Sequence, residues 1–386
     1  MDLTLTEDQE TIQSTARELL DSRSATADAR AMAGDPAGYS TRLWEEMVGL
    51  GWTGLALPVS YGGVGSGFLE LCLLVEELGA HQVPTPFVPT AVCCAMPVLR
   101  FGTDEQKKEW LGAVAEGRVM SYVLDGVDGG WEAPGASVVA TENGDGFVLD
   151  GAAAFVPYAD AAGDLLVVAR GPGGGDSGGG DSGGLTAFVV DAGTPGIRRT
   201  PVDVVGHDPS CHLGFQEVAV ASDRVLGGVG EGRAVADAIA AYGAAATCAE
   251  MVGGARRVLD MSVEYAGQRE QFGRPIGGFQ AVQHHCADMA IDVLSARFIA
   301  YEAIWRLAEG LDAATEVSMA KAAVGEAYQR VVGLGHQVHG AIGFTKEHAL
   351  HSYFRHAMAS ALAFGDGDFH WERVAGRLGV PSGSGR

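Results

Sequence analysis

Lysine is scarce in this sequence, and positive charge as a whole is in the minority. The chain has 26 Lys and Arg residues against 49 Asp and Glu residues, for a formal net charge of -23 at pH 7. Its lysines are Lys107, Lys108, Lys321 and Lys346. An acidic surface of this strength is repelled by phosphate backbones and by anionic lipid. We therefore expect neither nucleic acid nor a membrane surface as a partner.

Two further features are missing from the chain. No apolar run predicts a membrane-spanning segment, and the start at Met1 lacks the basic residues of a signal peptide, so we expect a cytoplasmic protein. The cysteines show no metal-binding or redox spacing, so we expect no metal site and reduced, buried thiols. They are Cys72, Cys93, Cys94, Cys211, Cys248 and Cys286.

The chain length and the order of helix and strand patterns predict an α+β fold in three parts. The chain has 386 residues and 47% hydrophobic content, enough for two or three packed domains. Residues 1–117 are expected to form a helical domain, 118–227 a middle domain of antiparallel strands, and 228–386 a helical bundle. The strand segments are short, β-branched and bounded by Gly or Asp, as in Leu165-Leu-Val-Val168.

Helix signals support the first and last parts. Thr6-Glu-Asp-Gln9 and Thr103-Asp-Glu-Gln106 both read as capping boxes, in which the glutamine reaches back to the threonine backbone. Long Ala-rich amphipathic stretches at 234–268, 279–308 and 314–335 with short connections predict a four-helix bundle. Between two expected strands, residues 171–184 are almost entirely glycine, aspartate and serine, which predicts a mobile hairpin loop.

Two motifs carry the functional information. They are Arg269-Glu-Gln-Phe-Gly-Arg-Pro-Ile276, closed by Phe279-Gln280, and Gln337-Val-His-Gly-Ala-Ile-Gly-Phe344. With the segment from Trp44 to Gly63, they resemble the signatures of the acyl-CoA dehydrogenase family. The resemblance covers nearly the whole chain and implies that family's fold and its cofactor, FAD. It also implies that the two motifs reach across a subunit interface to the FAD of a neighbouring chain.

The resemblance implies a set of cofactor-binding residues, each with suitable chemistry. Arginine offers a permanent cation and a planar fork of donors for the pyrophosphate, and the phenylalanine offers an apolar surface near the adenosine half. Glutamines donate and accept hydrogen bonds, and small residues let backbone approach the nucleotide. The implied residues are Arg269, Gln271, Phe272, Ile276, Gln280, Gln337, Val338, Gly340 and Ala341.

The base that this family uses is missing at both places where the resemblance locates it. Most members carry a glutamate shortly after the second motif, and here that position holds Phe364. A second group carries it 26 residues before the motif arginine, and here that position holds Gly243. Asp366 remains a candidate by sequence proximity, although carboxylates at Gly-rich turns are usually capping groups. Glu250 lies two helical turns from Gly243, too far to replace it.

The middle domain also departs from the family pattern, in the segments that the resemblance places beside the flavin. The segment from Leu124 to Pro134 keeps little of the family's Thr-Glu-Pro flavin segment. Phe155-Val-Pro157 stands where the family has Trp-Ile-Thr, which flanks the flavin and donates a hydrogen bond to its N5 side. Pro157 has neither a hydroxyl nor an N–H, so it cannot donate that bond.

These departures make the chain most similar to the non-catalytic subunit of actinobacterial α2β2 acyl-CoA dehydrogenases, which include steroid side-chain enzymes. The resemblance implies a catalytic paralogue as partner, an acyl-CoA substrate and an electron-transfer flavoprotein as acceptor. Steroid, fatty and branched acyl groups all stay open. Two other hypotheses stand beside this one. The chain could be a self-sufficient homotetrameric flavoenzyme with an unusual base such as Asp366, or a purely structural protein that binds no flavin.

Overall fold

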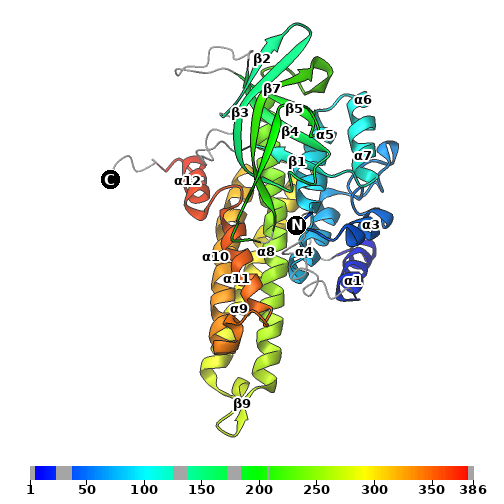
Figure 1. Ribbon diagram of the computed structural model, residues 1–386. Helices are drawn as coiled ribbons and strands as arrows, with labels where there is room; N and C mark the ends of the chain where they lie inside the picture. The colour runs from blue at the N-terminus through cyan, green and yellow to red at the C-terminus, as the bar shows by residue number, and fades with distance from the viewer. Residues whose placement is uncertain (1–4, 23–36, 125–136, 172–183, 207, 381–386) are drawn as a thin grey trace.

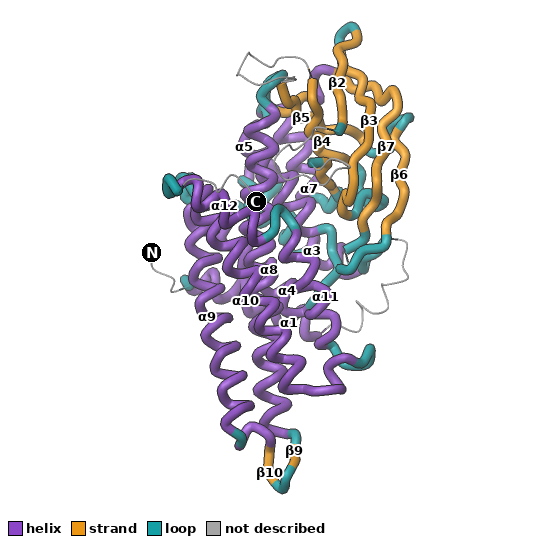
Figure 2. The backbone as a smooth tube through the Cα atoms, turned by 90° about the vertical axis from the view of Figure 1, so that its left-hand side faces the viewer, coloured by secondary structure: helices purple, strands orange, loops and turns teal. Residues whose placement is uncertain are grey.

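The chain is built as a long helical bundle with a twisted sheet at one end and shorter helices along its side (Figure 1). The structure is a computed structural model that describes residues 5–22, 37–124, 137–171, 184–206 and 208–380. The mixed α+β fold expected from the sequence is confirmed. The sheet lies between two helical parts in the sequence, and the bundle extends well beyond it (Figure 2).

The first part is helical. It comprises α1 (Glu7–Ser22), α3 (Thr41–Gly49), η1 (Val59–Tyr61), α4 (Phe68–His81), η2 (Val88–Cys94), α5 (Ala95–Phe101), α6 (Asp104–Gln106), η3 (Lys107–Leu111) and α7 (Gly112–Ala115). Both expected capping boxes are confirmed. The Gln9 backbone N–H donates to the Thr6 hydroxyl at 3.3 Å, and the Thr6 N–H donates to Gln9 Oε1 at 3.0 Å. The pair Thr103 and Gln106 repeats both distances.

The middle part is a sheet with strand order β6-β7-β3-β2-β4-β5-β8, in which β1 also pairs with β4. Neighbouring strands are mostly antiparallel, as expected, but β1 and β2 both run parallel to β4. The expected glycine loop lies outside the described residues except for its ends, Gly171 and Gly184, which pair across β4 and β5. The strands are β1 (Met120–Val123), β2 (Val138–Asn143), β3 (Gly146–Pro157), β4 (Asp164–Gly171), β5 (Gly184–Asp191), β6 (Ile197–Val202), β7 (Ser210–Ala221) and β8 (Val225–Leu226), with η4 (Ser222–Arg224) before the last.

The third part is the bundle. It comprises α8 (Gly232–Gln268), the hairpin β9 (Glu270–Gln271) and β10 (Arg274–Pro275), η5 (Ile276–Gly278), α9 (Gln280–Ala308), α10 (Ala314–His339), η6 (Gly340–Phe344), α11 (Leu350–Leu362) and α12 (Gly367–Arg377). The three long helices lie where the sequence predicts them, and α10 continues into the second motif. By length and composition α8 could cross a membrane, but 78% of its most apolar window is buried inside the fold. It is the core helix of the bundle.

Glycines let the first helical part approach α8 closely. A Cβ at Gly79 of α4 would lie 2.1 Å from the Glu250 carbonyl oxygen, and one at Gly253 of α8 would lie 1.8 Å from the Glu76 carbonyl oxygen. Real Cβ atoms do not approach so near, so any larger residue would push the two helices apart. These glycines set the distance between α4 and α8.

Buried charges connect the same helices. Glu76 and Glu77 of α4 are fully buried. Arg256 of α8 lies 2.9 Å from Glu77 and 3.5 Å from Glu76, Arg17 of α1 lies 2.9 Å from Glu77, and Arg297 of α9 lies 3.6 Å from Glu76. Buried carboxylates must be paired, because water no longer solvates them. The network thereby joins four helices.

Replacing Arg256 with alanine should therefore destabilise the protein strongly. The change leaves two buried carboxylates with only the cations of α1 and α9, and breaking a buried ion pair costs about 3–5 kcal/mol. The measurement is thermal and urea-induced unfolding. The control is Arg42→Ala, which breaks an exposed pair with Glu46 at 3.3 Å and should cost about 1 kcal/mol or less. Equal losses in both variants would contradict the structural role of the network.

Candidate functional site

The first motif forms an exposed hairpin at the far tip of the bundle, where β9 is labelled in Figure 1. Arg269 caps the end of α8, its backbone N–H donating to the Tyr265 carbonyl at 2.8 Å, while its guanidinium lies at the exposed surface. Phe272 sits at the turn with a φ of 54° and 93% of its surface exposed. A left-handed phenylalanine that is almost fully exposed is unfavourable in an isolated chain, because its ring buries nothing.

The remaining residues of the first motif lie beside the hairpin. Gln271 in β9 is exposed, Ile276 in η5 is half-buried, and Gln280 is the exposed first residue of α9. The Ile276 N–H donates to the Arg269 carbonyl at 2.8 Å, which closes the hairpin. The tip therefore presents polar and aromatic side chains on a backbone that is internally hydrogen-bonded.

The second motif lies at the same end of the bundle. Gln337 is exposed on the last turn of α10, Val338 is buried beneath it, and Gly340 and Ala341 are exposed in η6. Gly340 has a φ of 65°, and no atom lies within 4 Å of the place where its Cβ would be. The helix end thus has open backbone, which a bound group can approach.

Aromatic stacking fixes the two motifs relative to each other. The His339 ring stacks on Tyr265 of α8, with 4.6 Å between ring centroids, and its Nδ1–H donates to the Gly335 carbonyl at 2.9 Å. His336, one turn earlier, stacks on Phe344 at 4.3 Å. Burial lowers the pKa of both histidines, which favours their neutral forms. The sequence interpretation missed these positioning residues, although histidines three apart at a motif-bearing helix end were a readable signal.

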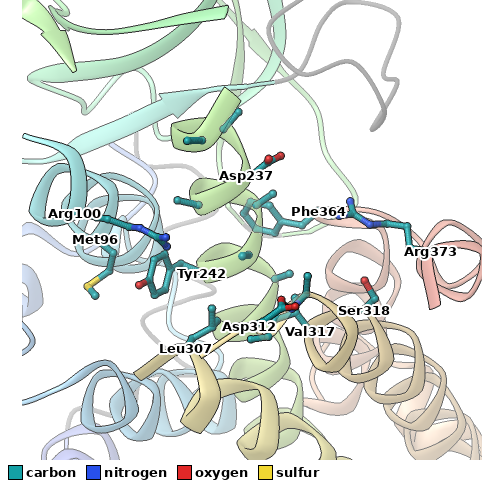
Figure 3. Close-up of a pocket in the computed structure, with 18 of the residues that line it drawn as sticks. Met96, Arg100, Asp237, Tyr242, Leu307, Asp312, Val317, Ser318, Phe364 and Arg373 are labelled. Carbon is teal, nitrogen blue, oxygen red and sulfur yellow. The ribbon is translucent and has the colours of Figure 1, made fainter. Parts of the chain in front are cut away.

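The two positions where the family's base was sought face each other at the opposite end of α8. Phe364 follows α11 with a φ of 57°, and its ring lies against α8 (Figure 3). A Cβ at Gly243 would lie 2.3 Å from Phe364 Cζ. The same ring stacks on Tyr122 of β1, with centroids 5.7 Å apart. The space of both base positions is therefore filled by one aromatic ring.

Two buried groups hold the turn that carries Phe364. Lys321 Nζ donates to the Ala361 carbonyl at 2.8 Å and to the Gly365 carbonyl at 3.0 Å, and burial lowers its pKa to about 8. His370 Nε2 donates to the Phe364 carbonyl at 3.0 Å. Burial, reinforced by the nearby Lys321 charge, lowers the His370 pKa to about 4, so its imidazole is neutral near pH 7. The turn is rigidly held in this position.

A cavity of about 860 Å³ opens beside Phe364, between α5, the first half of α8, the α9–α10 connection and α12. Its inner wall is apolar and includes Met96, Leu124 and Tyr242. Among the described lining residues, the carboxylates are Asp237 and Asp312. Asp237 pairs with Arg233 at 3.0 Å and Asp312 with Arg377 at 3.4 Å. Ion-paired carboxylates are poorly suited to take a proton from a substrate.

The two substitute carboxylates considered from the sequence are both engaged elsewhere. Asp366 is the N-cap of α12, and its Oδ1 accepts from the Phe369 N–H at 2.9 Å. Glu250 lies 3.4 Å from His356 Nε2, two helical turns along α8 from Gly243. Neither lines the cavity. Their geometry is that of a helix cap and of a buried polar contact.

The middle-domain residues that depart from the family pattern lie at the C-terminal end of β3, between β7 and β2. Pro157 ends β3, and its carbonyl accepts a hydrogen bond from the Ser121 hydroxyl. Phe155 is exposed with a φ of 53°, and its ring lies 5.3 Å from the His212 ring. Of the segment from Leu124 to Pro134, residues 125–134 lie outside the described residues. Pro157 has no N–H, so this residue offers no backbone donor at the end of β3.

The fold and this cavity define the acyl-CoA dehydrogenase class of proteins. Residues 6–118 match the family model of the acyl-CoA dehydrogenase N-terminal domain, and residues 230–379 match that of the C-terminal domain. FadE27 of Mycobacterium tuberculosis, an acyl-CoA dehydrogenase, is 33% identical over 88% of each chain. The protein belongs to the acyl-CoA dehydrogenase family.

Solved structures of the family agree over the full length. Butyryl-CoA dehydrogenase from Megasphaera elsdenii superposes with a TM-score of 0.90 at 29% identity, covering 98% of this chain and 100% of that one. A chain of the ChsE4–ChsE5 complex from M. tuberculosis superposes with a TM-score of 0.88 at 31% identity, covering 99% and 100%. The neighbours thus include a structure described as a two-chain complex.

Members of the family are FAD-dependent, which agrees with the cofactor expected from the sequence. The described residues fit this cofactor in one place and not in the other. At the bundle tip, an exposed cation, an exposed aromatic ring and open backbone at Gly340 suit a dinucleotide. Beside the cavity, Phe364 fills the position where the base was sought, and Pro157 at the end of β3 has no N–H to donate. No group of three or more potential metal ligands occurs among the described residues.

Gly243 and Phe364 should be energetically coupled. Gly243→Ala places a Cβ into the Phe364 ring and should lower the free energy of unfolding by about 1–3 kcal/mol. In a Phe364→Ala background, the same change should be neutral or stabilising, because the ring is gone. Both effects can be read from a double-mutant cycle of thermal unfolding.

Gly267→Ala on the same helix is the matched control. No atom lies within 4 Å of its Cβ position, so alanine should stabilise the helix by roughly 0.5–1 kcal/mol. Additive losses from Gly243→Ala and Phe364→Ala would show that the ring does not occupy the space over Gly243.

Proposed function

We propose that this chain is the non-catalytic subunit of an FAD-dependent acyl-CoA dehydrogenase, and that it completes the FAD site of a catalytic paralogue. The assembly is an α2β2 heterotetramer that introduces an α,β double bond into an acyl-CoA thioester. The chain lends the bundle tip to its partner and performs no proton abstraction itself.

The separation of the two half-sites carries this proposal. Gly243 and Arg269 lie 26 residues apart on one continuous helix, which corresponds to about 39 Å at ~1.5 Å per residue. An FAD whose flavin ring lay beside the cavity could not reach the hairpin of the same chain. The hairpin is therefore placed to serve the cofactor of another chain, and its exposed Phe272 is suited to burial at such an interface.

The filled base position supports the assignment of the catalytic role to the partner. Neither Phe364 nor Gly243 can accept a proton, and the cavity carboxylates are held by arginines. When bound, FAD would accept the hydride that leaves the β-carbon of the thioester, and a carboxylate of the partner would take the α-proton. We place an electron-transfer flavoprotein downstream as the acceptor of the electrons.

The motif residues have distinct tasks in this assembly. Arg269 binds the pyrophosphate with its guanidinium fork, and Phe272 covers the adenosine half from water. Gln271, Gln280 and Gln337 supply hydrogen bonds at polar atoms of the cofactor. Ile276, Val338, Gly340 and Ala341 shape the backbone and the apolar floor around it.

The first test is the flavin content of the chain alone and with a partner. Expressed alone, it should purify with little FAD and should not reduce an electron acceptor when acyl-CoA is added. Co-expressed with a paralogue that carries the glutamate, the complex should be yellow and active, with about one FAD per heterodimer. A yellow, active lone chain would instead support a homotetramer using Asp366, and a complex without flavin would support a structural protein.

The second test is Arg269→Ala in the complex. Losing a charge-assisted hydrogen bond costs about 1.5–3 kcal/mol, so FAD affinity should fall roughly tenfold to a hundredfold. Activity should return in part when excess FAD is added, and Arg269→Lys should recover only part of the affinity because a point charge lacks the fork. Arg42→Ala, which removes an exposed cation in the N-terminal helices, should leave FAD affinity unchanged. Full flavin occupancy in Arg269→Ala would contradict the donated half-site.

A further inference from the structure

Four histidines gather around the second motif. His336 and His339 lie in the last turn of α10, and His348 and His351 lie at the start of α11. The motif segment η6 joins these two helices, and α11 packs against both α10 and α8. The ring centroids of His339 and His348 are 4.8 Å apart. A charge on one of the four rings therefore acts on the others.

The His336 ring is enclosed without a hydrogen-bond partner. It is 6% exposed, and neither of its ring nitrogens has a partner among the described residues. Phe344 stacks on the ring at 4.3 Å, Phe354 meets it edge-on at 5.5 Å, and a Cβ at Gly343 would lie 3.1 Å from its Nδ1. A proton added here would bring a charge into a place with little water. The packing therefore favours the neutral ring.

His348 is also held in its neutral form. Its Nδ1 accepts a hydrogen bond from the Leu350 N–H at 3.2 Å, at the first residue of α11. Protonation of Nδ1 would turn this acceptor into a donor and leave a helix-terminal N–H without its partner. The N-terminus of a helix also disfavours a cation, by about 0.3–1 kcal/mol. A charge on His348 would thus weaken the start of α11.

The end of α10 acts in the opposite direction. Its dipole favours a cation on His336 and His339 by about 0.3–1 kcal/mol. Burial outweighs this effect, since it lowers the pKa of both rings, and for His336 the charges of the other three histidines lower it further.

The other charged side chains on the neighbouring elements are exposed, where water and salt screen them. They are Arg257, Asp260 and Glu264 of α8, Lys346 and Glu347 of the connection between η6 and α11, and Arg355 of α11. Within the described residues, the charges that act on His336 belong to the other three histidines.

We propose that the four histidines form a pH-sensitive switch on the second motif, in which protonation of His336 and His348 frees η6 and the start of α11. Opening would displace the exposed backbone at Gly340 that is offered to the nucleotide. The opening concerns this chain alone, and only its effect on the nucleotide rests on the proposed function.

The direction of the switch follows from the buried rings. Their pKa lies below the ordinary histidine value in the folded chain. The stability that the neutral rings contribute is therefore present above about pH 6.5 and is lost as the pH falls through the folded pKa. Each histidine that gains a proton on opening changes the opening equilibrium by up to about tenfold per pH unit.

Hydrogen–deuterium exchange of the chain alone, followed by mass spectrometry, measures the opening. After correction for intrinsic exchange, residues 340–351 should lose at least about fivefold in protection between about pH 7.5 and about pH 5.5. His336→Phe combined with His348→Asn should reduce this change to less than about twofold, because phenylalanine keeps the stack and asparagine keeps an acceptor. His284→Asn alters an exposed histidine of α9 and should leave the response intact.

The single variant His348→Asn leaves the buried ring in place, so the test does not depend on the folding of His336→Phe. It should remove about half of the response on a logarithmic scale. In the co-purified complex, the Kd of FAD should rise at least about fivefold over the same pH range, and less than about twofold in the double variant.

The outcomes separate the switch from the proposed function. Protection of residues 340–351 that does not change with pH, or that changes equally in both His348→Asn and the double variant as in the wild type, would overturn the switch while the shared FAD site stands. Opening at low pH in a chain whose complexes hold no FAD would support the switch and overturn the proposed function. An FAD affinity that is independent of pH despite the opening would overturn the effect on the nucleotide.

Discussion

The length and continuity of α8 govern the organisation of this molecule. Because an α-helix rises by a nearly constant distance per residue, Gly243 in the first half of α8 and Arg269 at its C-terminal end cannot approach each other. The helix is held straight in the core by close glycine contacts with α4 and by the buried carboxylates Glu76 and Glu77. The cavity beside Phe364 and the motif hairpin are therefore held apart along the bundle.

Near the sheet, a single ring fills the positions where the base was sought, beside an open cavity. Phe364 occupies the space over Gly243, and the glycine is needed because any side chain would collide with the ring. Lys321 and His370 donate hydrogen bonds to backbone carbonyls of the turn, so the Phe364 ring is fixed in the core. The two positions where the base was sought are thus complementary, because one has a large side chain and the other has none. One packing arrangement accounts for both residues.

The far end and the outer bundle face have the properties of an incomplete site. Phe272 is almost fully exposed, and Ile291, Leu294 and Phe298 continue the apolar surface along α9. An acidic chain that leaves such side chains uncovered gains by burying them in a partner. The hairpin presents polar and aromatic side chains, whereas the exposed surface of α9 is apolar.

By itself, the sequence determined the α+β class, the capping boxes and the long bundle helices, because these follow from local periodicity and capping chemistry. Motif identity also located Arg269, Gln337 and the positions Gly243 and Phe364, although their roles stay predictions. Only the tertiary structure decided that Phe364 lies on Gly243 and that β1 runs parallel to β4. It also decided that an exposed apolar stripe faces outward from α9. These features depend on contacts between residues far apart in the chain, and local sequence patterns do not encode which distant surfaces meet.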